Sequence, residues 1–285
     1  MLFPVRLVRG WLPPRWESRV ERFVWTDPKL LLDRDVSSED FRKAMNAVYV
    51  GGTFKITGAR RHPSADDLLT NNLDLSRSVI VDIGASDGST SLDLISRLPD
   101  FNSYIIADLF LNIQAQRVKE RILFFDASNV CILVVSRRLL AWPSMSRSVH
   151  LLYRRSIRAA SRAGADRVDV LLLNPEVRRL MQDDARIGFK VHDVFTTWDG
   201  PTPDVIKVAN LLRRLYFSDD QISRALAAIN RSLPEGGHLL VVDNAREKGI
   251  DTRAGLYQRR GDRFVLIEST PHDPEIGDLV LASGA

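Results

Sequence analysis

The stretch that decides the fold is Val79–Gly88, which runs Val-Ile-Val-Asp-Ile-Gly-Ala-Ser-Asp-Gly. A short β-branched run, a glycine-containing segment and the helical pattern of Thr90–Leu98 predict a strand, a tight turn and a helix. In α/β proteins this arrangement holds a nucleotide at the carboxyl end of the first strand. Glycine at positions 84 and 88 lets the backbone approach a ligand closely. The sequence therefore predicts an α/β fold with a binding site at this turn.

Further short apolar runs extend this opening unit toward the C-terminus. Strands that alternate with helices favour a parallel sheet with helices on its faces. Strands are predicted at Tyr104–Ala107, Val168–Leu173, Phe189–His192, Val205–Val208 and Leu239–Val242, helices at Pro175–Met181 and Asp219–Leu233, and a closing antiparallel strand pair at Phe264–Glu268 and Asp278–Ala282.

Several strings after the turn carry a family resemblance. They are Asp108, which ends the second predicted strand twenty residues after Gly88, Phe189–Phe195 (Phe-Lys-Val-His-Asp-Val-Phe), Pro203–Leu212 (Pro-Asp-Val-Ile-Lys-Val-Ala-Asn-Leu-Leu) and Leu233–Val242, which contains Pro-Glu-Gly-Gly. Together with Val79–Gly88 they resemble, in order, the motifs of class I (Rossmann-like) S-adenosylmethionine-dependent methyltransferases. The resemblance covers residues 78–242, and Ser86 stands where that family commonly has a glycine.

The resemblance implies S-adenosyl-L-methionine as the cofactor. It assigns the cofactor contacts to Asp82, Gly84, Ala85, Ser86, Gly88, Asp108, Asp193, Val194 and Asn210. Asp108 would hold the ribose, since a carboxylate about 20 residues beyond the glycine turn can accept both hydroxyls, and Asp193 would meet the adenine amino group. One alternative stays open: if Val168–Leu173 is the second strand, Asn174 faces the ribose instead.

The implied reaction is methyl transfer to an oxygen or nitrogen of a small molecule, with an anionic or lipid-linked molecule as the expected substrate. No residue stands out as a base, and the substrate-facing candidates are Tyr49, Arg60, Asn210, Arg213 and Tyr216. The segment Asn210–Phe217 also resembles the chemotaxis-receptor methyltransferases, which supplies the alternative of a protein carboxyl methyltransferase. A further alternative is a binding protein that keeps the cofactor fold without activity.

A hydrolase is the remote alternative. Gly84–Gly88 also fits the Gly-x-Ser-x-Gly turn of serine hydrolases, and Asp243 and His272 follow in the required order. That fold places several strands of its sheet before the turn, whereas the segment before Val79 is predicted to be rich in helix. A nicotinamide-dependent dehydrogenase is disfavoured because the chain lacks Gly-x-Gly-x-x-Gly at this turn.

Two domains are expected. Residues 1–70 form a helical N-terminal cap, whose helix begins at the serine cap Ser37, and residues 71–285 form the methyltransferase domain. An insertion at about 113–165 interrupts that domain. It combines a hairpin, Arg121–Phe125 with Val130–Val135, and a helix at Arg147–Arg162, and we interpret it as a lid.

Charge is distributed unevenly along the chain. The total is 40 Lys and Arg against 36 Asp and Glu, yet no acidic residue lies between Ala127 and Ala165, a segment with seven arginines. Such asymmetry indicates an anionic partner. We expect Arg147–Arg162 to meet an anionic membrane surface or a phosphate-bearing substrate, and the sequence predicts no specific nucleic acid.

Composition excludes several classes of protein. No segment of the 285 residues approaches the roughly 20 apolar residues of a membrane-spanning helix, and Arg6 and Arg9 fall where a signal peptide needs apolar residues. The single cysteine, Cys131, excludes an internal disulfide and a cysteine-cluster zinc site, and no other metal-ligand spacing is visible. We expect a cytoplasmic protein that is either soluble or at most peripheral at the membrane.

Overall fold

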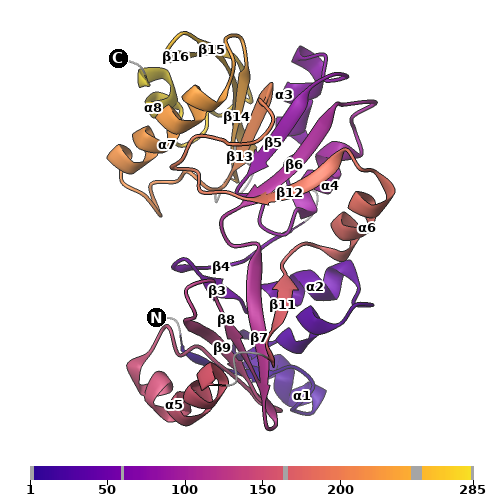
Figure 1. The fold of residues 1–285 in the computed structure, drawn as a ribbon, viewed down its shortest axis with the longest axis vertical. Coiled ribbons are helices and arrows are strands. Elements are labelled where there is room, and N and C mark those ends of the chain that lie inside the picture. The colour runs from indigo at the N-terminus through magenta and orange to yellow at the C-terminus, as the bar shows by residue number, and fades with distance from the viewer. Residues whose placement is uncertain (1–2, 59–60, 163–165, 245–251, 284–285) are drawn as a thin grey trace. The chain divides into compact units, whose positions relative to one another are not determined.

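The computed structural model describes residues 3–58, 61–162, 166–244 and 252–283. Its contacts divide the chain into two compact units. Unit 1 comprises Met1–Thr57 and Phe110–Glu176, and unit 2 comprises Gly58–Leu109 and Val177–Ala285. Each unit contains one seven-stranded sheet (Figure 1).

The sheet of unit 2 has the strand order β12-β6-β5-β13-β14-β15-β16. The first five strands in this order are parallel to one another, and β15 and β16 are antiparallel to their preceding neighbours. The strands are β5 (Val79–Ile83), β6 (Ser103–Asp108), β12 (Ile187–Val191), β13 (Val205–Ala209), β14 (His238–Asn244), β15 (Thr252–Arg260) and β16 (Arg263–Ser269). This is the mixed α/β fold that the sequence predicts.

The strand β5 marks the point where the strand order reverses. From β5 the chain continues to β6 and β12 on one side, and then to β13 and β14 on the other. All five residues of β5 are buried, as expected for a parallel strand covered on both faces. In sheets of this kind ligands bind outside the carboxyl ends of the strands at the reversal point. Here that point is the end of β5 and β13.

The helices of unit 2 are α3 (Pro63–Asn72), α4 (Ser89–Ile95), α7 (Asp219–Ser232) and α8 (Gly277–Ala282); α6 (Pro175–Asp183) begins in the last residues of unit 1. The helix α7 begins with a capping box, in which Ser218 and Gln221 bond each other's backbone N–H groups. Its apolar side chains contact the sheet at helical spacing, with Ile222, Leu226 and Ile229 buried.

The C-terminal segment corrects one prediction. Asp278–Ala282 lies in the helix α8, and the partner of β16 is β15, which the sequence analysis did not identify. The helix forms because Ile276 and Val280, four residues apart, are both fully buried in the core of unit 2, and i, i+4 spacing places them on one helical face.

The sheet of unit 1 has the order β11-β7-β8-β9-β10-β1-β2. The strands of this sheet are β1 (Val5–Val8), β2 (Val24–Trp25), β7 (Asn112–Val118), β8 (Arg121–Phe125), β9 (Cys131–Val135), β10 (Leu139–Ala141) and β11 (Val168–Leu171). A separate two-stranded ribbon consists of β3 (Tyr49–Val50) and β4 (Thr53–Phe54). The helices are α1 (Pro14–Glu17), α2 (Ser38–Met45) and α5 (Arg147–Arg162), and short 3-10 turns occur at Ser18–Phe23 and Pro28–Leu32. The hairpin of β8 and β9 and the bounds of α5 are as predicted.

Unit 1 groups the chain differently from the predicted domains. The N-terminal segment is not only helical, because β1 pairs with β10 of the insertion, Val5 opposite Ala141. The insertion exceeds a hairpin and a helix and spans Phe110–Glu176, while α3, expected in the cap, contacts strands of unit 2. The N-terminal strands complete the inserted sheet, and so both segments fold into one unit.

The strand β11 lies outside the parallel sheet in which it was predicted. It pairs antiparallel with β7, with Val168 opposite Ala115 and Leu171 opposite Asn112. Because β7 follows β6 closely in the chain and was not predicted from the sequence, the partner of β11 was missed.

Two apolar clusters cover the two faces of the inserted sheet. One joins Phe124 and Trp142 to Phe41 and Met45 of α2. The other joins Phe125 and neighbouring sheet residues to α5. Unit 1 is therefore a sheet with α2 packed on one face and α5 on the other. Burial also raises the pKa of the Cys131 thiol in this sheet to about 12.

Candidate functional site

The turn Gly84–Gly88 follows β5 and is fixed by the neighbouring strand. The N–H groups of Gly84 and Ala85 both donate to the carbonyl of Ala107, at 2.8 and 3.2 Å. Gly84, Ser86 and Gly88 all have positive φ, at 77°, 58° and 75°. This conformation favours glycine at all three positions, and two of them have it.

Packing also requires the two glycines. A Cβ at Gly84 would lie 2.8 Å from a methyl of Leu211, and one at Gly88 would lie 3.0 Å from a methyl of Val177. The fold itself therefore accounts for both glycines, in addition to any close approach of a ligand.

Asp108 ends β6 beside this turn. Its Oδ2 accepts a hydrogen bond from the N–H of Ser86 at 3.0 Å, and the residue is 8% exposed. Because β6 pairs directly with β5, the end of this strand lies next to the glycine turn. The structure thus brings together Ser86 and Asp108, which were both predicted as cofactor contacts.

Asn174 has a different position. It follows β11, which belongs to the sheet of unit 1, and its Oδ1 accepts the N–H of Glu176 at 3.0 Å at the start of α6. The residue is fully buried. The strand beside β5 that carries a carboxylate at its end is therefore β6, and the ribose contact of Asp108 remains a prediction.

Asp82 lies inside the sheet. It is fully buried, and its Oδ2 accepts hydrogen bonds from the hydroxyls of Ser91 (2.8 Å) and Tyr104 (3.1 Å). Its neighbour in the parallel register is Lys207 of β13, whose Nζ lies 2.8 Å from Asp66 Oδ1. Burial raises the pKa of Asp82, and the charge of Lys207 opposes that rise. These contacts connect Asp82 to the internal packing of β5, β6 and β13.

Asp193 and Val194 follow β12 at the same edge of the sheet. The Oδ1 of Asp193 accepts the N–H of Phe195 at 3.0 Å, which closes a local turn, and Val194 is buried in the core of unit 2. The preceding His192 is buried edge-on against Trp198, with ring centroids 5.0 Å apart. The contact between Asp193 and the adenine of the cofactor remains a prediction.

Asn210 directly follows β13 and has a left-handed conformation with φ of 56°. Its Oδ1 accepts the N–H of Asn244 at 2.8 Å, and its Nδ2 lies 3.1 Å from Nε2 of His62. His62 Nε2 in turn lies 2.8 Å from the side-chain amide of Asn244. With its amide nitrogen toward His62, Asn244 accepts two hydrogen bonds from Arg61, at 2.6 and 2.8 Å. Four residues therefore form a polar cluster, which we call the His62 cluster: Arg61, His62, Asn210 and Asn244.

His62 is neutral in this environment. Burial lowers its pKa to about 3, and the positive charges of Lys207 and Arg61 add to that effect. The two carboxamides can donate to Nε2, which places the ring proton on Nδ1. That Nδ1 is buried and has no hydrogen-bond partner among the residues described. The cluster therefore offers a neutral donor at the ends of β13 and β14.

Among the described residues, the other substrate-facing candidates lie on different elements. Arg213 is paired with Glu275 at 3.1 Å, which engages its guanidinium within unit 2. Tyr216 is 49% exposed, and Tyr49 lies in unit 1, where its ring packs against Phe54. Arg60 lies outside the described residues. Of the four candidates that the structure describes, Asn210 is the one that belongs to the His62 cluster.

Ser86, Asp243 and His272 do not form a hydrolase triad in the part of the chain that the structure describes. Within residues 3–58, 61–162, 166–244 and 252–283, the buried Oγ of Ser86 has no hydrogen-bond partner, His272 is exposed, and Asp243 accepts from the N–H of Glu275 at 2.7 Å. In addition, β5 is the first strand of its sheet in chain order, whereas a hydrolase turn follows several strands.

The sequence analysis missed Arg61, His62 and Asn244. Their partners are distant in sequence, with His62 and Asn244 separated by 182 residues. The one available signal is Asn210 itself, a polar residue directly after a buried strand at the expected site edge. Lys207 gave a similar signal, since it interrupts the apolar run of β13.

Comparison with protein-family models and with curated proteins finds no match. Among solved structures, similar chains include the mitomycin 7-O-methyltransferase MmcR (18% identity, TM-score 0.35, 78% of this chain and 44% of that one). The N-methyltransferase NodS from Bradyrhizobium japonicum WM9, in complex with S-adenosyl-L-homocysteine, has 16% identity and a TM-score of 0.34, over 64% of this chain and 59% of that one.

A third similar structure is phosphoethanolamine N-methyltransferase 1 of Haemonchus contortus, with 13% identity and a TM-score of 0.36. The match covers 77% of this chain and 32% of that one. This chain therefore spans less than two thirds of the length of each of these three proteins.

Proposed function

We propose that unit 2 is an S-adenosylmethionine-dependent methyltransferase that acts on an oxygen or nitrogen of a small molecule. The observation that carries the proposal is the bond between Ser86 N–H and Asp108 Oδ2. It joins the glycine turn to the acidic end of the neighbouring strand at the point where the strand order reverses, which is where sheets of this class hold nucleotides.

The residues present fit the cofactor. Asp108 places a carboxylate beside the turn, as a ribose diol requires. Two buried polar atoms at this edge, Ser86 Oγ and His62 Nδ1, have no partner in the part of the chain that the structure describes. A buried polar atom without a hydrogen bond is costly, and a polar ligand at this edge would supply the missing partners.

The cofactor, when bound, supplies a methyl group on a positively charged sulfur. The chain's own contribution is alignment and exclusion of water. Asp108 would hold the ribose, and Asp193 the adenine. The His62 cluster would orient the acceptor, because His62 Nδ1–H can donate to an oxygen of the substrate while the two asparagines fix the ring. A neutral imidazole with a lowered pKa is a weak base, and so this role is positioning.

An anionic or lipid-linked substrate is the finer part of the proposal. Its support is charge: unit 1 contains 21 Lys and Arg against 12 Asp and Glu, whereas unit 2 contains 19 against 24. The net positive charge of the chain therefore belongs to unit 1, at +9 against −5 for unit 2. A basic unit attached to the methyltransferase would attract an anionic substrate.

Calorimetry with S-adenosyl-L-homocysteine tests the proposal. Wild-type protein should bind, and incubation with labelled S-adenosyl-L-methionine and a lysate should label a small molecule. Label on protein instead would favour the carboxyl methyltransferase alternative, and binding without turnover would favour an inactive binding protein. No binding at all would show that the proposal is wrong.

A further inference from the structure

The helix α5 turns one face toward the sheet of unit 1 and the other outward. Val149, Tyr153 and Ala160 are buried against Phe125 and the neighbouring sheet residues. Arg121 of β8 fixes the helix further, since it donates to the Ser156 hydroxyl at 2.8 Å. The apolar side of α5 is thus already used by the fold. Leu152 of the same helix, by contrast, is 73% exposed.

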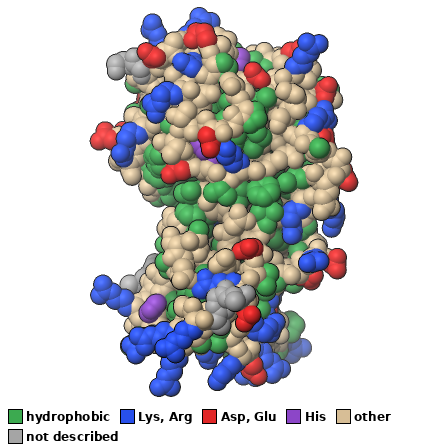
Figure 2. Space-filling view, in the orientation of Figure 1, with side chains coloured by type: hydrophobic (Ala, Val, Ile, Leu, Met, Phe, Trp, Pro, Cys, Tyr) green, Lys and Arg blue, Asp and Glu red, His purple; other side chains and the backbone are tan. Residues whose placement is uncertain are grey.

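The outward face is strongly basic. It carries five exposed arginines, and among the residues that the structure describes none of them makes an ion pair. Figure 2 shows blue side chains gathered over this part of unit 1. We call it the α5 arginine face, and it consists of Arg147, Arg154, Arg155, Arg158 and Arg162 together with Leu151.

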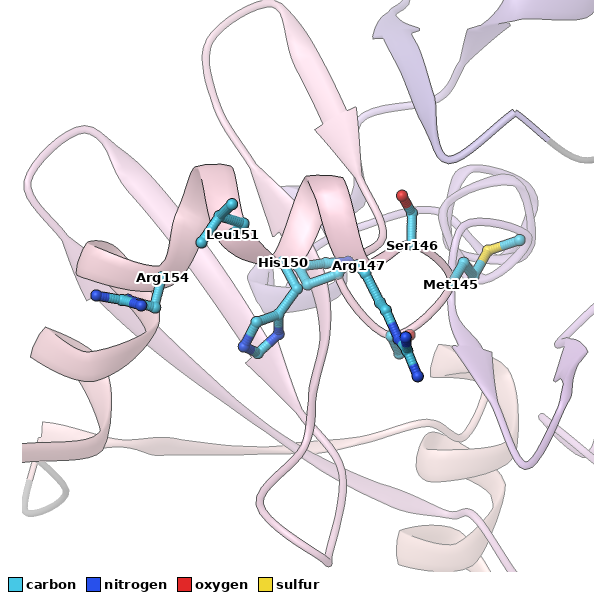
Figure 3. A pocket seen from close by; sticks show the side chains of 8 residues that line it. Met145, Ser146, Arg147, His150, Leu151 and Arg154 are labelled. Carbon is cyan, nitrogen blue, oxygen red and sulfur yellow. The ribbon is translucent and has the colours of Figure 1, made fainter.

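An apolar side chain lies in the middle of this charge. Leu151 is 65% exposed, and it is four residues after Arg147, three before Arg154 and four before Arg155, so that the three arginines surround it on the helix surface. A hollow of about 580 Å³ adjoins it, lined by Met145, Arg147, His150, Leu151 and Arg154 among others (Figure 3). The hollow therefore combines apolar and basic side chains from the loop before α5 and from α5 itself.

We propose that the α5 arginine face docks on an anionic phospholipid bilayer. Arginines would contact the lipid phosphates, while Leu151 and the adjacent Leu152 would reach the boundary between headgroups and acyl chains. The structure contains no helix, within its described residues, that is long and apolar enough to cross a membrane. Attachment would accordingly be peripheral and mainly electrostatic. It does not depend on the proposed function of unit 2.

The composition of the face favours lipid over RNA. Single-stranded RNA is bound by basic surfaces that also offer aromatic side chains on which bases stack. The outward positions of α5 have two leucines and no Phe, Tyr or Trp, because Tyr153 is buried. Exposed leucines among arginines instead suit a bilayer surface, which has charged headgroups outside and apolar acyl chains beneath them.

Sedimentation of the full chain with vesicles tests the proposal. Wild-type protein should bind vesicles of phosphatidylglycerol and phosphatidylcholine and should not bind phosphatidylcholine alone. Each basic residue near an anionic surface raises partitioning about fivefold, so that the triple variant Arg154→Glu, Arg155→Glu, Arg158→Glu should lose at least tenfold, and 0.5 M salt should have the same effect. Leu151→Gln should weaken binding severalfold without changing its salt dependence.

The matched control changes the net charge of the protein by the same amount, but in unit 2. The variant Arg224→Glu, Arg231→Glu, Arg263→Glu replaces three exposed arginines and should bind vesicles like the wild type. Equal losses in both triple variants would overturn the proposal, because they would indicate a response to net charge alone. Absence of vesicle binding by the wild type would overturn it as well. So would α5-dependent binding of an RNA oligonucleotide without vesicle binding, which would reassign the face to nucleic acid.

Discussion

Lys207 Nζ lies 2.8 Å from Asp66 Oδ1, with the two side chains 0% and 2% exposed. This buried ion pair joins β13 to α3, and Lys207 is also the register neighbour of Asp82. One cation thus serves two buried carboxyl groups, and burial raises the pKa of both. Lys207 lies three residues before Asn210, so that the pair anchors the strand that leads to the His62 cluster.

Removing one partner of this pair should destabilise the protein strongly. Asp66→Ala leaves the Lys207 ammonium buried without its carboxylate, and such changes cost about 3–5 kcal/mol. The double variant Asp66→Leu, Lys207→Met should be less destabilised than Asp66→Ala, because neither charge of the pair is then left alone and Asp82 keeps the hydroxyls of Ser91 and Tyr104. Urea unfolding of the three proteins measures this, and a double variant that is less stable than the single one would contradict it.

The variant Lys207→Met should acquire a distinct pH dependence. Without the ammonium, the pKa of Asp66 and of Asp82 rises further in the folded state, while unfolded Asp titrates near 3.9. The folded state then holds protons that the unfolded state releases, and stability falls as the pH rises above about 4. We expect a larger loss relative to wild type at pH 8 than at pH 5. An equal loss at both values would show that the carboxyl groups find another partner.

His62 gives a pH dependence of opposite sign. Its folded pKa is about 3, whereas an unfolded histidine titrates near 6.5. Between these values the unfolded chain binds a proton that the folded chain does not, and stability falls as the pH decreases, by at most about 1.4 kcal/mol per pH unit. His62→Gln should remove this part of the slope between pH 6.5 and 4. Unfolding curves at several pH values for both proteins provide the measurement, and identical slopes would contradict the burial of a neutral imidazole.

Gly88 should contribute to the stability of the fold. Its φ of 75° is unfavourable for other residues, and a Cβ there would lie 3.0 Å from Val177 and 3.2 Å from Ile106. Gly88→Ala should therefore cost on the order of 2 kcal/mol, made up of the left-handed conformation and the contact. Gly261→Ala is the matched control, with φ of 61° and no atom within 4 Å. If the two variants lose equal stability, the packing contribution at Gly88 is negligible.

Local patterns predicted the parallel core well. The run Val79–Ile83 became β5, the serine at position 37 caps α2, and α5 has the predicted bounds. Each of these depends on residues within a few positions of one another. The segment Asp278–Ala282 shows the limit, because it lies in α8, with Ile276 and Val280 buried in the core of unit 2, and a short apolar run does not by itself distinguish a helix from a strand.

Non-local pairing could not be predicted. The strand β1 depends on β10, with Val5 opposite Ala141, and neither segment identifies its partner. The same holds for the site: Asn210 and His62 are 148 residues apart, and a single histidine before a proline gives no sign of its partners. Glycines and acids in the turn were visible because they follow one strand, whereas a cluster assembled from three segments is defined only by the fold.

The ribose contact distinguishes Asp108 from Asn174. A carboxylate that accepts ribose hydroxyls contributes about 1.5–3 kcal/mol for each charged hydrogen bond, and so Asp108→Ala should weaken S-adenosyl-L-homocysteine binding at least tenfold. Because the same carboxylate accepts Ser86 N–H at 3.0 Å, Asp108→Asn is the companion variant: it keeps an acceptor for the turn, loses the charge, and should bind with an affinity between those of the wild type and Asp108→Ala.

The variant Asn174→Ala tests the alternative ribose contact. It removes an acceptor at the start of α6, which should lower stability by about 1 kcal/mol and leave binding unchanged. Calorimetry with Asp262→Ala, an exposed carboxylate of the β15–β16 turn, controls for net charge. Unchanged binding in both Asp108 variants, together with a loss in Asn174→Ala, would transfer the ribose contact to Asn174.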